Sequence, residues 1–115
     1  MASAHEKLQK ECFLYFWNNY PQYRMLMHAN INSHHKWNKI DISVLKGIGL
    51  VKGILDLEFY YKGVLYVFDI KIGKDKLSKE QLYCIKQVEE HGGKGFEIRS
   101  FCDFKELIYQ ILNNK

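Results

Sequence analysis

The chain has 115 residues, 47% of them apolar, which is enough for one compact domain that we expect to span residues 1–115. The longest apolar runs are a few residues, and no basic region followed by an apolar stretch opens the chain. These features predict no membrane-spanning helix and no signal peptide, so we expect a cytoplasmic, intracellular protein. The net charge of +4 is compatible with nucleic-acid binding, but also with many unrelated domains.

In chain order, the first predicted element is a helix over residues 4–19, where apolar side chains recur at helical spacing and Pro21 marks the end. Residues 23–28 are predicted as a short strand that leads into a polar loop. Residues 36–47 are predicted as a helix that stops at the glycines following it.

Two strands rich in β-branched and aromatic residues come next, over 54–60 and 64–71, and the short link between them predicts a hairpin. A basic loop over 72–77 follows. Ser78 and Gln81 form a capping-box pattern that opens a helix, which ends at Gly92-Gly93.

The apolar face of that helix is predicted to comprise Leu82, Ile85 and Val88. A short strand over 96–99 precedes a last helix, for which Asp103 is the predicted cap. This order of elements predicts an α/β fold: a mixed sheet with a central hairpin, flanked by helices. Its last helix has a predicted buried stripe of Phe104, Leu107, Ile108, Ile111 and Leu112.

The cysteines indicate neither a disulfide framework nor a structural zinc site. Cys12, Cys84 and Cys102 are far apart, odd in number, and form no CxxC pair. Cys12 and Cys84 fall among apolar helix positions, where we expect reduced, buried thiols.

Three charged residues stand out on the apolar hairpin. Asp69 and Lys71 point to the same face of their strand because strand side chains alternate, and Asp56 on the preceding strand can share that face. Carboxylate and carbonyl oxygens favour hard divalent cations, so Asp56, Asp69 and the backbone carbonyl of Ile70 are candidate ligands of Mg²⁺ or Mn²⁺. The alternative is a cross-strand salt bridge between Lys71 and one of the two carboxylates.

Lysines lie on both sides of this acidic segment in the sequence, a distribution that suits a site holding a polyanion next to a metal. An ordinary solvated surface is the alternative. The lysines before the segment are Lys36, Lys39, Lys46 and Lys52, and those after it include Lys74, Lys76 and Lys79.

Five segments of the chain form a recognisable combination of motifs: Gly49-Leu50-Val51-Lys52-Gly53-Ile54-Leu55-Asp56-Leu57, Phe68-Asp69-Ile70-Lys71, Leu77-Ser78-Lys79-Glu80-Gln81, Glu6-Lys7-Leu8-Gln9 and His28-Ala29-Asn30. Together they resemble the virus-type replication-repair nuclease (VRR-NUC) domain of the PD-(D/E)xK nuclease superfamily. The resemblance departs from the family at Leu55, where many members have Pro, and at Asp69, which replaces the more usual Glu.

This resemblance implies a restriction-endonuclease-like core and assigns roles to five residues. Asp56 and Asp69 would be metal ligands, Lys71 the catalytic lysine, Gln81 a contact from its helix, and Glu6 a further metal ligand from the first helix. Capping is the alternative role for Gln81, and for Glu6 as the partner of a Ser3 cap. The fallback acid on the first helix is Glu11, which a helix-surface position explains equally well.

The resemblance implies a Mg²⁺- or Mn²⁺-dependent, structure-selective DNA endonuclease, acting as a homodimer on four-way (Holliday) junctions. The alternatives are a catalytically inactive DNA-binding or assembly module of the same fold and a monomeric flap or nicking repair nuclease. The histidines do not predict zinc, because two adjacent histidines cannot readily bind one ion. The residues expected to contact DNA are His28, Asn30, His34, His35, Lys36, Lys52, Lys74 and Lys76.

Overall fold

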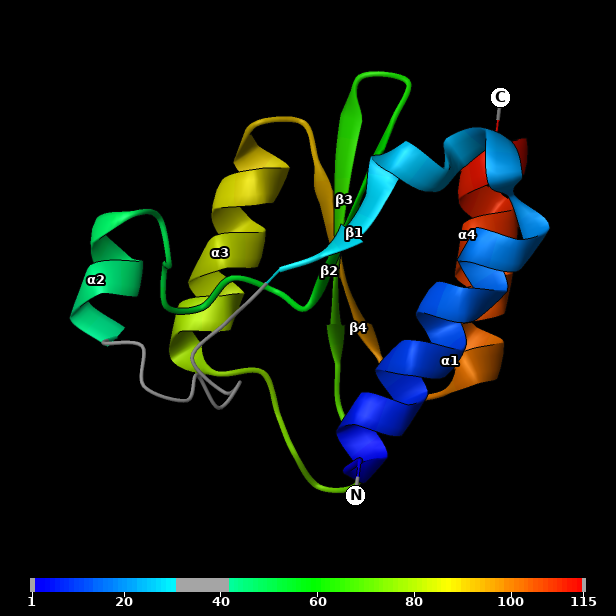
Figure 1. The fold of residues 1–115 in the computed structure, drawn as a ribbon. Helices are drawn as coiled ribbons and strands as arrows, with labels where there is room; N and C mark the ends of the chain where they lie inside the picture. The colour runs from blue at the N-terminus through cyan, green and yellow to red at the C-terminus, as the bar shows by residue number, and fades with distance from the viewer. Residues whose placement is uncertain (1, 31–41, 115) are drawn as a thin grey trace.

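The computed structural model describes residues 2–30 and 42–114 of the chain. Figure 1 shows a sheet in the middle of the molecule, with α1 and α4 on one side of it and α2 and α3 on the other. In chain order the elements are α1 (Ala4–Asn19), the 3₁₀-helix η1 (Pro21–Leu26), β1 (Met27–Ala29), α2 (Ile42–Gly47), β2 (Leu57–Tyr61), β3 (Val64–Ile70), α3 (Lys79–Glu90), β4 (Lys94–Ile98) and α4 (Phe101–Asn113).

The four strands form one mixed sheet in the order β1-β2-β3-β4. The first two pairs are antiparallel and β3 pairs with β4 in parallel, a connection that needs the crossover helix α3. Lys62 and Gly63, both at positive φ, connect β2 to β3 in the tight turn that hairpins favour. The predicted hairpin and the predicted α/β class, a mixed sheet flanked by helices, are thus confirmed.

The main hydrophobic core lies between the sheet and the α1–α4 pair. Phe59 of β2 and Phe68 of β3 point into it, where Phe59 packs edge-to-face on Phe16 and Phe68 on Phe104. Cys12 is fully buried here, as predicted, and burial raises the pKa of its thiol to about 12. Cys84, also predicted to be buried, is half-buried on α3, so that part of the prediction was too strong.

Helix α3 packs closely on the opposite face of the sheet. A Cβ atom at Gly95 would lie 2.7 Å from the Ile85 side chain, so this glycine allows the helix to approach β4. The predicted apolar face of α3 is wrong at Leu82, which is 55% exposed. Ile85 and Val88 do face inward, and the stripe is completed by Gln81 and Cys84 in place of Leu82.

Several predicted boundaries were also wrong. Most of the segment predicted as a strand over 23–28 is the 3₁₀-helix η1, because Pro21 at its start fixes a helical φ. The strand predicted over 54–60 begins only at Leu57, so Asp56 lies just before it. Ser100, and not Asp103, caps α4, since its hydroxyl accepts a hydrogen bond from the Asp103 amide.

The helix predicted over 36–47 is observed as α2 from Ile42, and its first predicted residues lie outside the described part of the chain. Within the described residues, no helix is both long and apolar enough to cross a membrane.

Candidate active site

Asp56 and Asp69 lie side by side at one end of the β2–β3 hairpin. The register pairs Leu57 with Phe68, and continuing it by one residue places Asp56 opposite Asp69 on the face covered by α3. Both residues are buried, at 3% and 1% exposure. Buried carboxylates are costly unless hydrogen bonds or cations compensate them, so their partners define the site.

Backbone and side-chain donors hold Asp56 in place. Its Oδ2 accepts a hydrogen bond from the Ile70 amide at 2.8 Å and lies 3.0 Å from Nε2 of His5 on α1. Asn30 holds the segment before β2, since its amide N–H donates to the Asp56 carbonyl at 2.9 Å and its Nδ2 to the Leu55 carbonyl at 3.0 Å. The Asp56 carboxylate is therefore held from β3 and α1, and its backbone from the residue that follows β1.

Asp69 is held between a lysine and an amide. Lys71 Nζ lies 2.9 Å from Oδ2, in an ion pair without the angles of a hydrogen bond, and Gln81 Nε2 donates to Oδ1 at 3.2 Å. Burial and the charge of Asp56 raise the pKa of Asp69 from 3.8 to about 6, and Lys71 only partly opposes this. The predicted salt bridge to Lys71 thus exists, on Asp69, while the neighbouring Asp56 carboxylate is paired with His5.

Gln81 serves both as a cap and as a site residue. Its Oε1 accepts from the Ser78 amide at 2.8 Å, and the Gln81 amide donates to Ser78 Oγ at 3.1 Å, so the predicted capping box is formed. Its Nε2 remains available and donates to Asp69. The two interpretations of Gln81 from the sequence are therefore compatible in one residue.

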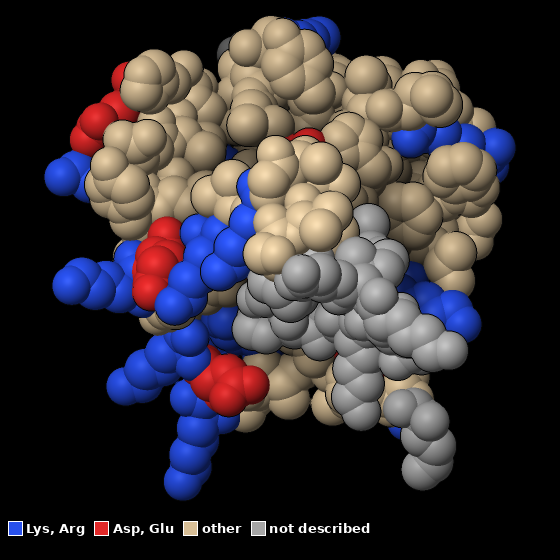
Figure 2. Space-filling view, turned by 60° about the vertical axis from the view of Figure 1, so that its left-hand side comes forward, with Lys and Arg blue, Asp and Glu red and all other residues tan. Residues whose placement is uncertain are grey.

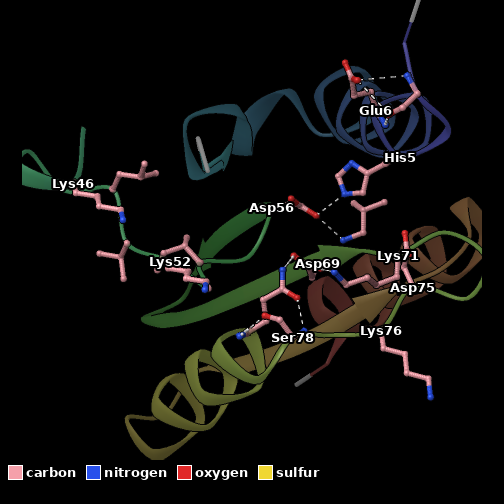
Figure 3. Close-up of a pocket in the computed structure, with 17 residues that line it drawn as sticks. His5, Glu6, Lys46, Lys52, Asp56, Asp69, Lys71, Asp75, Lys76 and Ser78 are labelled. Carbon is pink, nitrogen blue, oxygen red and sulfur yellow. Dashed lines mark hydrogen bonds and ion pairs between the residues drawn. The ribbon is translucent and has the colours of Figure 1, made fainter. Parts of the chain in front are cut away.

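The carboxylate pair opens into a pocket of about 860 Å³, at the meeting point of α1, the segment before β2, β3 and the start of α3. Figure 3 shows His5 directed at Asp56 and Lys71 beside Asp69, with Lys46 and Lys52 on the far wall. Lys52 also forms an ion pair with Glu80 at 3.1 Å. The basic residues of the wall are Lys46, Lys52, Lys71 and Lys76.

Arg99 holds the basic loop that borders this pocket. Its guanidinium donates to the carbonyls of Gly73 at 3.0 Å and of Asp75, and it forms an ion pair with Glu97. The loop carries Lys74, which is exposed, and Lys76, which lines the pocket. Arg99 thereby fixes the backbone that presents both lysines.

The predicted acid of the first helix, Glu6, lies at the edge of the same pocket, but its carboxylate is directed elsewhere. It accepts from the Ser3 hydroxyl at 3.2 Å, while the Glu6 amide donates to Ser3 Oγ, so the capping box suggested by the sequence is formed. Glu11, the fallback acid, is exposed on α1 and does not line the pocket. The structure thus uses the Glu6 carboxylate in a helix cap and leaves Glu11 outside the pocket.

The expected DNA contacts divide into three groups. Lys52, Lys74 and Lys76 lie in or beside the pocket, as described above. His28 is exposed and forms an ion pair with Glu58 at 3.3 Å, whereas the Asn30 amide group is used within the fold. The remaining three, His34, His35 and Lys36, lie outside the described residues.

His5 is the site residue that the sequence interpretation missed. It was overlooked because Asp56 is 51 positions away and because Glu6 matched a known motif. The helical spacing contained the signal, since His5 lies on the same stripe of α1 as the inward residues Leu8, Cys12 and Phe16. Glu6 lies about 100° away from that stripe.

Gly53 positions the Asp56 segment against α3. Its φ of +93° excludes a side chain, and so does the Glu80 backbone, which would lie 2.7 Å from a Cβ atom at this position. We expect Gly53→Ala to lower the free energy of unfolding by about 2 kcal/mol or more, measured by urea denaturation. Gly49→Ala is the control, because Gly49 also has a positive φ but a Cβ atom there would meet no atom within 4 Å. This variant should lose less unfolding free energy than Gly53→Ala. Equal losses would show that the close approach is unimportant.

The donor set of the pocket fits a hard divalent cation. Two adjacent buried carboxylates with one lysine create a negative site, and Mg²⁺ is commonly held by one or two carboxylates with water completing its shell. Among the residues that the structure describes, no three His, Cys, Asp or Glu side chains converge as a ready-made metal site. The Ile70 carbonyl and water would therefore have to supply the other ligands.

Comparison with known proteins gives structural similarity without sequence similarity. No protein-family model matches the sequence, and no curated protein matches it. A solved structure described as a VRR_NUC domain protein superposes with a TM-score of 0.74, covering 96% of this chain and 88% of that one, at 13% identity. The chain has a VRR-NUC fold. The restriction-endonuclease-like core implied by the motifs is confirmed by this likeness, which at such low identity concerns the fold alone.

Proposed function

We propose that this VRR-NUC fold is a Mg²⁺- or Mn²⁺-dependent DNA endonuclease that hydrolyses phosphodiester bonds. The observation that carries the proposal is the buried Asp56–Asp69 pair, with Lys71 and Gln81 against it, at the base of a lysine-lined pocket. An ion pair made only for stability would not need a second carboxylate, whose charge raises the pKa of the first. The repulsion between the two carboxylates destabilises the metal-free protein, and a bound cation would relieve it.

The side chains would divide the work of hydrolysis between them. When bound by Asp56, Asp69 and the Ile70 carbonyl, the metal supplies a water of lowered pKa and polarises the phosphodiester. Lys71, whose side chain is only 14% exposed, can orient the attacking water or offset charge that develops on the phosphate. The Ile70 amide and the Gln81 amide group keep the two carboxylates in position, which limits reorganisation during the reaction.

The surroundings of the pocket suit a phosphate backbone. Figure 2 shows Lys and Arg side chains gathered on part of the face that carries α2 and α3, interrupted by acidic side chains. Lys46, Lys52 and Lys76 reach the pocket from the segments on either side of β2 and β3. Such contacts give affinity without reading bases, which supports selectivity for DNA structure over DNA sequence.

We further propose, from the family that the motifs resemble, that the substrate is branched DNA and that two copies of the chain act together. A four-way junction has two equivalent strands to cut, and a symmetric dimer offers one site to each. The test is to incubate the protein with Mg²⁺ or Mn²⁺ and with four-way, flap and linear duplex DNA, while light scattering reports its mass.

We expect paired cuts in the four-way junction and a dimer in solution. A monomer that prefers flaps or nicks would favour the repair-nuclease alternative. DNA binding without cleavage in either metal would favour the inactive module, for which the Asp at position 69 in place of Glu is the main sequence support.

A further inference from the structure

We propose that His5 is the residue through which helix α1 binds the metal ion, and that the site therefore prefers Mn²⁺ to Mg²⁺. This inference rests on the proposed metal-dependent function and deepens it. Figure 3 shows the contrast on which it depends: the His5 ring points to Asp56, while the Glu6 side chain points away from it. The Glu6 carboxylate accepts instead from the Ser3 hydroxyl.

The distance between His5 and Asp56 is that of a hydrogen bond, and it is also compatible with two neighbouring ligands of one metal ion. Two ligand atoms about 2.1 Å from one ion and at right angles to each other lie about 3.0 Å apart. Nε2 of His5 and Oδ2 of Asp56 are 3.0 Å apart. Both residues line the pocket that holds Asp69. Since the three side chains do not converge as a metal site in the described residues, they would turn toward a cation that replaces the proton between His5 and Asp56.

The periodicity of α1 keeps His5, and not Glu6, directed at the sheet. Cys12 and Phe16 are buried and Leu8 packs against the same core, which fixes the rotation of the helix about its axis. His5 continues that stripe toward the N-terminus and is half-buried. For Glu6 to reach the ion, its carboxylate would have to leave the capping box with Ser3, whereas His5 has no such second role.

A histidine ligand has a chemical consequence. Mg²⁺ demands oxygen ligands and gives up its water reluctantly, whereas imidazole nitrogen is a good ligand for first-row transition ions. A site with His5, Asp56 and Asp69 should therefore bind Mn²⁺ more tightly than Mg²⁺. Removal of the imidazole should bring the two affinities closer together.

The test measures Mn²⁺ binding to the full chain without DNA, from the electron paramagnetic resonance signal of free Mn²⁺, with Mg²⁺ as a competitor. His5→Gln keeps a side-chain donor for Asp56 but removes the imidazole, and it should weaken Mn²⁺ binding at least about tenfold while changing Mg²⁺ binding less. Glu6→Gln preserves the capping box and should change Mn²⁺ affinity less than about twofold.

A spectroscopic readout identifies the ligand directly. The electron spin-echo signal of bound Mn²⁺ should show coupling to imidazole nitrogen in the wild-type protein and in the control His28→Ala, and should lose it in His5→Gln. Unchanged Mn²⁺ affinity or persistent nitrogen coupling in His5→Gln would overturn the inference, as would an equal or larger loss of affinity in Glu6→Gln.

The inference and the proposed function can fail separately. A wild-type protein that binds Mn²⁺ through His5 but cuts no DNA keeps the inference and rejects the nuclease. A protein that cuts DNA while His5→Gln binds Mn²⁺ normally keeps the nuclease and rejects the inference. If wild type binds no Mn²⁺, the inference is overturned, and cleavage of DNA in Mg²⁺ still decides the proposed function.

Discussion

Replacing Asp56 by Asn is expected to reduce DNA cleavage by at least about 100-fold while the protein stays folded and continues to bind DNA. The asparagine Oδ1 can still accept the hydrogen bond from the Ile70 amide, so the fold keeps its contact. The substitution removes one of the two charges available for a metal ion. It removes both the repulsion that Asp56 exerts on Asp69 and the ion pair with His5, so stability should change little.

The matched control is Asp75→Asn, which removes an acidic charge from the wall of the same pocket. Asp75 is exposed, and Arg99 contacts only its backbone carbonyl, so cleavage should stay within about twofold of wild type. Cleavage rates on a four-way junction, together with a binding assay in Ca²⁺, separate the two variants. If Asp56→Asn cuts as fast as wild type, the assignment of the active site is wrong.

Asp69 is expected to make the metal-free protein less stable as the pH rises. Its pKa in the folded state, about 6, exceeds the ordinary value of 3.8, so folding favours the protonated form. The stabilisation is fully present below about pH 3.8 and is lost as the pH rises through about 6. This rise in pKa corresponds to a loss of roughly 3 kcal/mol of unfolding free energy at most, because part of the effect is shared with Asp56.

Asp69→Asn isolates this effect, since asparagine resembles the protonated acid and can still accept from Gln81. In urea denaturation without metal, the variant should match wild type near pH 4 and exceed its free energy of unfolding near pH 7.5. Addition of Mn²⁺ at pH 7.5 should stabilise the wild-type protein and have much less effect on the variant. If the two proteins had equal free energies of unfolding at both pH values, the ionised form of Asp69 would not destabilise the fold.

Local patterns in the sequence were the reliable guides to the fold. The capping boxes of Ser3 and Ser78 and the hairpin turn at Lys62-Gly63 depend on residues within a few positions of one another, and all three formed. The failed prediction of the α3 face, by contrast, depends on a tertiary contact. Leu82 has the right residue type for a buried face, but the approach of α3 to the sheet turned Gln81 inward instead.

The candidate site shows the same division between near and distant residues. The alternation of β3 was sufficient to place Asp69 and Lys71 together, and the hairpin brought Asp56 opposite them. His5 could not be assigned from local sequence, because its place depends on how α1 packs across the end of the sheet. A known motif also favoured its neighbour, Glu6, whose capping role the structure shows.

The double hydrogen bonding of Gln81 explains why an amide stands at that position. A capping box accepts either Glu or Gln at its last position, and the two are nearly equivalent for starting a helix. The Ser78 amide can only donate, which leaves the Gln81 nitrogen to face Asp69. A glutamate would cap α3 equally well but would bring a third negative charge against the buried pair. The buried carboxylates thus favour Gln over Glu at this position. The hydrogen bond that aligns Asp69 in turn requires the first turn of α3.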